Sequence, residues 1–195
     1  MHPSESLTSK QAGIGTHPLR FLLWLMIISS TMAFAAFTSA YIVRRGEGNW
    51  LEFDLPQSLL INTVVVALSS VTMQLAHYFA RRDELARVRV FLVATFLLGI
   101  VFLVGQWQVW AELALNNVHF AGADSNPSGS FVYVLMGFHG AHILAGLIFL
   151  AKTFAKTLQY KVHSRSMLSI GNCTIFWHFL GGLWLYLYLF LLLNH

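Results

Sequence analysis

Histidine is the residue type in this sequence best suited to chemistry, because four histidines lie in strongly apolar stretches. His139 and His142 stand three residues apart and share one helix face with Gly146. His77 and His178 come from two other apolar stretches. Imidazole nitrogens bind haem iron, copper or zinc, and they also form hydrogen bonds between helices in a membrane. The residue type therefore permits either a cofactor site or a role in helix packing.

A packing role is the interpretation we favour. Haem held by two histidines needs one on each face of the macrocycle, and two histidines one turn apart on one helix do not supply that. A copper or iron site usually adds a third histidine, a cysteine or a carboxylate, and the chain has a single cysteine, Cys173. We therefore expect no catalytic, metal or cofactor-binding residue in this chain.

Glu112 is an acidic residue near the end of an apolar stretch. A proton relay through the membrane would need a chain of polar partners, and only Gln106 and Gln108 stand nearby in the sequence. The residue is therefore predicted to be a solvated carboxylate at the outer interface.

The candidates fall in five segments that are long enough to cross a membrane. Of the 195 residues, 56% are hydrophobic and 10% are charged, whereas soluble domains carry roughly 25% charged residues. A spanning helix needs about 20 mostly apolar residues. The segments that meet this length are 19–43, 57–79, 90–113, 131–155 and 173–193. We predict an all-α integral membrane protein, with a flexible arm over 1–18 and one five-helix bundle over 19–195.

The basic residues predict the orientation of the bundle. Ten of the 12 Lys and Arg residues belong to the side that holds the N-terminus, and only Arg44 and Arg45 belong to the other side. Since basic residues accumulate on the cytoplasmic side, the N-terminus is predicted inside and the C-terminus outside. The net charge of +4 is thus a topology signal, and no nucleic-acid partner is expected.

Small and aromatic residues indicate how the spans pack and where they meet the membrane interface. Small residues recur in the first and fourth spans, a pattern typical of closely packed membrane helices. Trp110, Trp177 and Tyr41 stand toward span ends, where aromatic residues often mark the membrane interface.

Several motifs, in order along the chain, resemble subunit III of haem–copper oxidases. They touch all five spans, so the resemblance covers nearly the whole sequence. The matching stretches are Leu19-Arg20-Phe21, Ser69-Ser70-Val71-Thr72 with Ala76-His77, Gly137-Phe138-His139-Gly140-Ala141-His142 through Gly146, and Phe176-Trp177-His178-Phe179 followed by Trp184-Leu185-Tyr186-Leu187. Gln106, Trp110 and Glu112 fall where the family has a Gln, an aromatic and an acidic residue.

Three family carboxylates are replaced in this chain. Where the family has a Glu in the first span, this chain has Ser30. It has Gly181 in place of an Asp after the Trp-His-Phe element, and Val109 in place of a Glu near Gln106. Roles that depend on those carboxylates do not carry over. The chain also resembles the short five-helix bacterial form, which lacks the first two helices of longer members.

The resemblance implies an accessory subunit of a bacterial inner-membrane oxidase. Such a subunit packs directly on subunit I, joins subunits II and IV, and in some systems enters a respiratory supercomplex. It binds phospholipid and supports proton uptake and oxygen access, while the haem and copper belong to partner subunits. Residues carried over as structural or lipid-contacting are His139, His142, Gly146, Trp177, His178 and Trp184, with His77 and Arg20 near the inner headgroups.

The electron donor remains open at this point, because the family serves both cytochrome c oxidases and quinol oxidases. The stretches 38–45 and 126–131 look most like cytochrome c oxidase members, so we favour cytochrome c. A His-ligated haem protein is a further alternative, motivated by the four intramembrane histidines. A small transporter is another, although all four prolines lie outside the spans and broken helices are therefore not expected.

Overall fold

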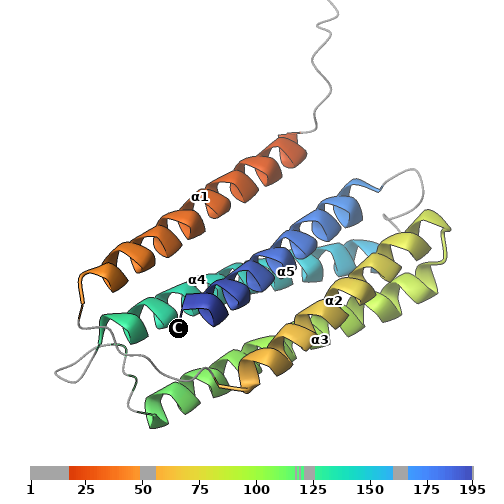
Figure 1. The fold of residues 1–195 in the computed structure, drawn as a ribbon. Coiled ribbons are helices and arrows are strands. Elements are labelled where there is room, and N and C mark those ends of the chain that lie inside the picture. Colours follow the sequence, from red (N-terminus) through yellow and green to blue (C-terminus); the bar gives the residue numbers. More distant parts are fainter. Residues whose placement is uncertain are drawn as a thin grey trace, which may run out of the picture.

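The computed structural model describes residues 18–48, 56–116, 118, 120, 126–159 and 167–194. These residues form five long helices (Figure 1). The helices are α1 (Pro18–Gly46), α2 (Ser58–Arg81), α3 (Leu85–Leu115), α4 (Pro127–Leu158) and α5 (Leu168–Asn194). Each is long and apolar enough to cross a membrane, so the prediction of an all-α protein with five spanning helices is confirmed.

Each helix is longer than its predicted span, because an apolar segment marks only the part that crosses the hydrocarbon. Helix α3 begins at Leu85, five residues before the predicted span, and includes Arg87 and Arg89. Helix α4 begins at Pro127, and the side chain of Asn126 caps it by accepting from the Ser128 N–H at 3.0 Å. The arm predicted over 1–18 lies outside the described residues, except that Pro18 is the first residue of α1.

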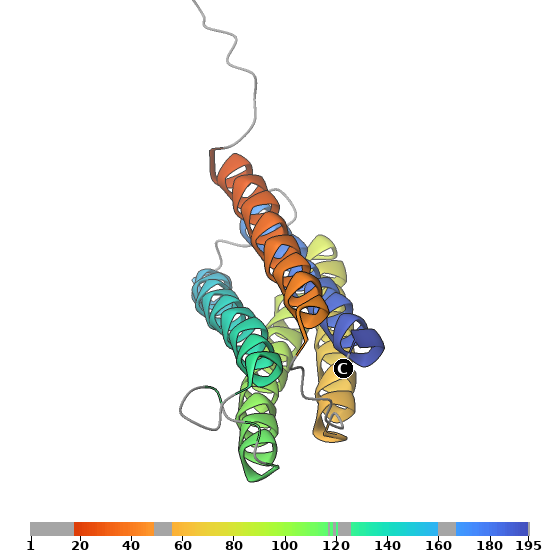
Figure 2. The same cartoon turned by 60° about the vertical axis from the view of Figure 1, so that its left-hand side comes forward.

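Four of the helices form a closed ring, and α1 lies outside it. Neighbours around the ring are α2 and α3, α3 and α4, α4 and α5, and α5 and α2. Within the described residues, α1 contacts α4 and α5 but neither α2 nor α3. Helix α1 thus covers the junction between α4 and α5 (Figure 2).

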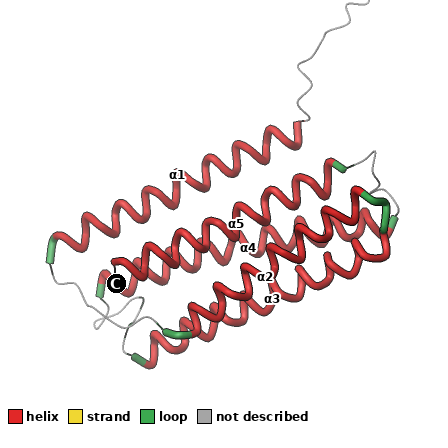
Figure 3. The backbone as a smooth tube through the Cα atoms, turned by 45° about the vertical axis from the view of Figure 1, so that its right-hand side comes forward, coloured by secondary structure: helices red, strands yellow, loops and turns green. Residues whose placement is uncertain are grey.

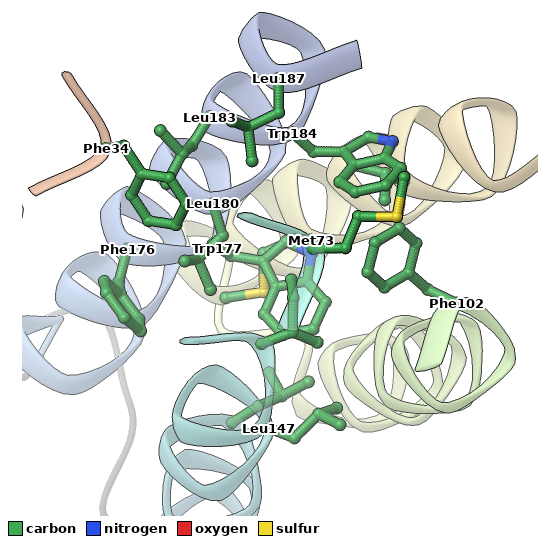
Figure 4. Packing of buried hydrophobic residues seen from close by; sticks show 14 of the residues in the cluster. Phe34, Met73, Phe102, Leu147, Phe176, Trp177, Leu180, Leu183, Trp184 and Leu187 are labelled. Atoms are coloured by element: carbon green, nitrogen blue, oxygen red, sulfur yellow. The ribbon is translucent and has the colours of Figure 1, made fainter. Parts of the chain in front are cut away.

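The core is supplied most densely by α5, which contacts α1, α2 and α4. Trp177, Leu180, Trp184 and Leu187 of α5 are buried and point toward the other helices (Figure 4). Trp177 and Tyr41 are only 4% and 1% exposed, so both side chains sit between helices. Their predicted depth at the membrane interface stays a prediction.

One end of the bundle holds most of the positive charge. The starts of α1, α3 and α5 and the ends of α2 and α4 meet there (Figure 3). This basic end carries Arg20, Arg81, Arg82, Arg87, Arg89, Lys152 and Lys156 among the described residues. Arg44 and Arg45 close α1 at the opposite end. The prediction that the basic end faces the cytoplasm stays a prediction.

Candidate functional site

The α2–α5 polar seam, the line of hydrogen bonds between these two helices, gathers four of the candidate residues. Two tryptophans open it: the indole N–H of Trp184 donates to the Thr63 hydroxyl at 3.1 Å, and that of Trp177 donates to the Ser69 hydroxyl at 3.1 Å. Each hydroxyl in turn donates to a carbonyl of its own helix. The indole N–H groups are therefore satisfied in the apolar interior, and they fix the register of α5 against α2.

Toward the basic end the seam continues through two histidines. The Nε2–H of His178 donates to the Gln74 side-chain oxygen at 3.0 Å. The Nε of Arg81 donates to His77 Nε2 at 3.2 Å, so this nitrogen carries no proton. Nδ1 of His77 then carries the ring proton and faces the Thr174 hydroxyl at 3.5 Å. His77 is thus a neutral link between an arginine at the helix end and the start of α5.

A basic pocket opens where the seam reaches the basic end. It has a volume of about 600 Å³ and lies between the first turns of α1 and α5 and the last turns of α2. Arg20, His77 and His178 all line it, and Arg81 and Gln74 join them. No acidic side chain lines the pocket within the described residues. Three candidates from three separate helices thus meet in one cavity with two guanidinium groups.

His142 joins α4 to α1. Its Nδ1 lies 2.8 Å from the carbonyl oxygen of Phe138, which can only accept, so Nδ1 carries the proton. Nε2 is then the acceptor for the Ser30 hydroxyl at 3.1 Å. Ser30 is 5% exposed. Ser30 therefore makes a neutral link between α1 and α4.

His139 lies apart from this link, although it is one turn away on α4. Its ring is fully buried and packs against Phe34, Phe102 and Trp184, with centroids 6.3, 5.8 and 5.2 Å away. Neither ring nitrogen has a hydrogen-bond partner among the described residues. The imidazole thus packs against rings of α1, α3 and α5.

Gly146 lies where α4 approaches α5. A Cβ at this position would come 2.8 Å from the Leu180 side chain and 3.4 Å from the Trp177 ring. Gly105 makes a closer approach between α3 and α2, because a Cβ there would collide with the side-chain amide of Asn62. Both glycines therefore set how near two helices can come.

Glu112 stands at the other end of the molecule, far from the basic pocket. The Ser58 hydroxyl, at the first residue of α2, lies 2.7 Å from each of its carboxylate oxygens. The side chain of Gln57, which precedes the helix, supplies no cap. A carboxylate from α3 thus occupies the N-terminus of α2, where the helix dipole favours negative charge. Glu112 is half-buried and ties two helices together at this end.

Sequence reasoning missed the polar partners of the candidate residues. Ser30, Thr63, Ser69, Gln74 and Arg81 complete the links described above. Hydroxyl residues at helical spacing on an apolar helix were the available signal, but such residues also bond to their own helix. Over the described residues, no group of three or more His, Cys, Asp or Glu side chains is arranged to hold a metal ion.

Comparison with known proteins places the chain in a family. The model of the family described as "Cytochrome c oxidase subunit III" matches residues 50–194, which include α2 to α5. The "Probable cytochrome c oxidase subunit 3" of Mycobacterium tuberculosis is 30% identical over 173 residues, covering 86% of this chain and 82% of the relative.

Two further relatives carry different names. The "Cytochrome c oxidase subunit 3" of Corynebacterium diphtheriae is 30% identical and covers 81% of this chain and 79% of its own length. The "Cytochrome bo(3) ubiquinol oxidase subunit 3" of Buchnera aphidicola is 27% identical, covering 89% of this chain and 85% of its own length. The family match over residues 50–194, the five-helix fold and these relatives agree, and the chain belongs to the cytochrome c oxidase subunit III family.

Proposed function

We propose that this protein is the accessory subunit III of a terminal haem–copper oxidase, and that the oxidase is a cytochrome c oxidase. The family match over residues 50–194 carries the proposal. In this role the chain packs on subunit I, assembles with subunits II and IV, and supports proton uptake and oxygen access. The haem and copper centres belong to its partners, and the complex resides in the bacterial inner membrane.

The arrangement of polar and apolar side chains supports a structural role for this subunit. Several of its polar side chains inside the bundle join two helices, as in the α2–α5 polar seam and the link from His142 to Ser30. Large apolar side chains remain exposed along α1, α2 and α3, including Leu22, Val64 and Val101. Such surfaces suit contact with other membrane helices and with lipid acyl chains.

The basic pocket is proposed to hold the phosphate of a phospholipid. Arg20 and Arg81 reach it from two helices that do not touch each other, and guanidinium groups match phosphate geometry. Arg81 uses Nε for His77, which leaves its two terminal nitrogens for a ligand. Removing both guanidinium groups (R20Q/R81Q) is expected to weaken retention of anionic lipid roughly 30-fold, from about 1 kcal/mol per arginine.

Affinity purification in a mild detergent tests the assignment of the chain. The tagged chain should bring along a large haem–copper subunit in equal amount, and the chain separated from it should show no haem absorption. A pure, monodisperse preparation of this chain alone with a stoichiometric haem band would refute the proposal and favour a His-ligated haem protein.

A quinol oxidase is the second candidate, because the Buchnera relative is named for ubiquinol. The site that binds the electron donor lies in other subunits, so the donor has to be identified from the activity of the purified complex. We expect it to oxidise reduced cytochrome c. Turnover with a quinol and none with cytochrome c would assign the chain to the quinol branch and leave its accessory role unchanged.

A further inference from the structure

Buried polar side chains without partners gather in the half of the bundle that lies away from the basic end. Among the described residues, buried nitrogen or oxygen atoms with no hydrogen-bond partner occur there on Asn62, Gln106, Trp110 and His139. Asn62 and Gln106 carry amides, and these side chains are only 3% and 4% exposed. Buried amides in native proteins almost always bond to protein or to ordered water, so these two amides need a ligand.

Asn62 and Gln106 lie close together where α2 meets α3. The Asn62 side chain packs on the backbone of Gly105, since a Cβ at that glycine would come 2.9 Å from Nδ2 of Asn62. Gln106 follows directly in α3, and its side chain is buried as well. One helical turn nearer the basic end, the rings of Phe102 and Trp184 meet with their centroids 4.9 Å apart (Figure 4). Aromatic side chains therefore separate the two amides from the basic end.

Polar groups lead from Asn62 to the end of the molecule opposite the basic end. Ser58 precedes Asn62 by four residues on the same face of α2, a rise of about 6 Å. The Ser58 hydroxyl lies 2.7 Å from each carboxylate oxygen of Glu112, which is half-buried. Water at this end of the bundle therefore meets polar side chains on the way to the amides.

The unpartnered atoms of the two amides determine which ligand they accept. Asn62 offers N–H donors at Nδ2, while Gln106 offers N–H donors at Nε2 and an acceptor at Oε1. The N–H groups would repel a cation, and an apolar ligand would leave all of these atoms without a hydrogen bond. Water accepts from N–H groups and donates to a carbonyl oxygen, and a buried water makes roughly two to four such bonds.

We propose that Asn62 and Gln106 bind at least one internal water molecule that bridges α2 and α3. Direct side-chain hydrogen bonds join these helices nearer the basic end, between Thr72 and Thr95, and at the opposite end, between the serine and carboxylate described above. The bound water joins the two helices at the level between these bonds. The site does not depend on the proposed function, because both amides belong to this chain.

His139 and a small neighbouring cavity are not part of this water site. The ring nitrogens of His139 have no partner either, but rings from three other helices surround the imidazole. The cavity has a volume of about 10 Å³, and its walls include Val66 and Phe102. The Ser69 hydroxyl in its wall already accepts from the Trp177 indole and donates to the Val66 carbonyl. We expect this cavity to be dry, because a buried water needs several polar partners.

Cryo-electron microscopy of the purified complex that contains this chain, at a resolution that shows ordered water, tests the site. The wild type should show water density within hydrogen-bond distance of both amides, about 2.7–3.2 Å. Gln106→Met keeps the length of the side chain and removes its amide, so this density should disappear. In mixed micelles the variant chain should also unfold about 2–4 °C below the wild type. Gln108→Met, at an exposed glutamine of the same helix, is the matched control and should change neither result.

Several results would overturn the proposal. No density at either amide, or two amides bonded directly to each other, would show that water does not bridge α2 and α3. An unfolding temperature of Gln106→Met equal to or above that of the wild type would show that the amide had no partner to lose. Density that persists in Gln106→Met would assign the water to other groups and contradict the role of Gln106.

Discussion

Replacing His142 by leucine tests how α1 is held to the other helices. The substitution removes the acceptor of the Ser30 hydroxyl and the donor to the Phe138 carbonyl. The carbonyl already belongs to the helix ladder, so the loss that matters is the bond between α1 and α4. Leucine restores part of the packing against Phe34, whose ring centroid lies 5.6 Å from the imidazole.

The size of the effect follows from interhelical hydrogen bonds measured in membranes, which average about 0.6 kcal/mol and reach roughly 1.7 kcal/mol. Ser30 can turn its hydroxyl toward the carbonyl four residues earlier in α1, which limits the loss. We expect His142→Leu to destabilise the chain by about 0.5–1.5 kcal/mol. The haem absorption of the complex should stay the same, because His142 is not proposed as a ligand.

A double-mutant cycle isolates the bond itself. His142→Leu, Ser30→Ala and the double variant are unfolded in mixed micelles and followed by circular dichroism. The coupling energy should be about 0.5–1.5 kcal/mol, and Ser29→Ala, an exposed neighbour, should cost little. A coupling energy near zero, or a shifted haem band in the complex, would show that the role assigned to His142 is wrong.

Three further substitutions test the packing in other places. Gly105→Ala should destabilise the chain by about 1–3 kcal/mol in the same assay, because its methyl group collides with the Asn62 amide on α2. Gly182→Ala, with open space around it, is the control and should be neutral or slightly stabilising. Equal effects of the two substitutions would refute the close approach of α3 to α2. His139→Leu should be neutral or stabilise the chain by about 1 kcal/mol, since it removes a buried ring without partners; a large loss of stability would reveal a partner for the imidazole. Glu112→Gln should cost about 1 kcal/mol, and an unchanged unfolding midpoint would mean that the carboxylate does not secure the start of α2.

Hydropathy predicted the five helices because each must satisfy its own backbone in lipid and expose apolar side chains to it. The same pattern could not give the helix ends. Arg87 and Arg89 belong to α3, since a helix continues into the polar interface once its backbone bonds are formed. Pro127 and Asn126 do mark the start of α4 as local capping rules require.

The sequence identified the candidate residues, but it did not predict which of them lie together in the fold. Helical spacing placed His139 and His142 on one face, yet one is a packing group and the other joins α1. The meeting of Arg20, His77 and His178 in one pocket depends on how three helices cross. No spacing along the chain encodes that, because the three residues come from separate spans.

The positions of the hydrogen bonds between helices determine which parts of this subunit are held most tightly. Bonds between α2 and α5 run from Trp184 to His77 and so reach the basic end, whereas those of α1 stop at Ser30. In lipid, apolar contact alone favours helix association only weakly. The basic pocket, lined by Arg20 and Arg81, lies beside the first turns of α1, where no such side-chain hydrogen bond joins the described residues of α1 to another helix. Anionic lipid from one leaflet would thus stabilise the part of the bundle that its own hydrogen bonds leave least secured.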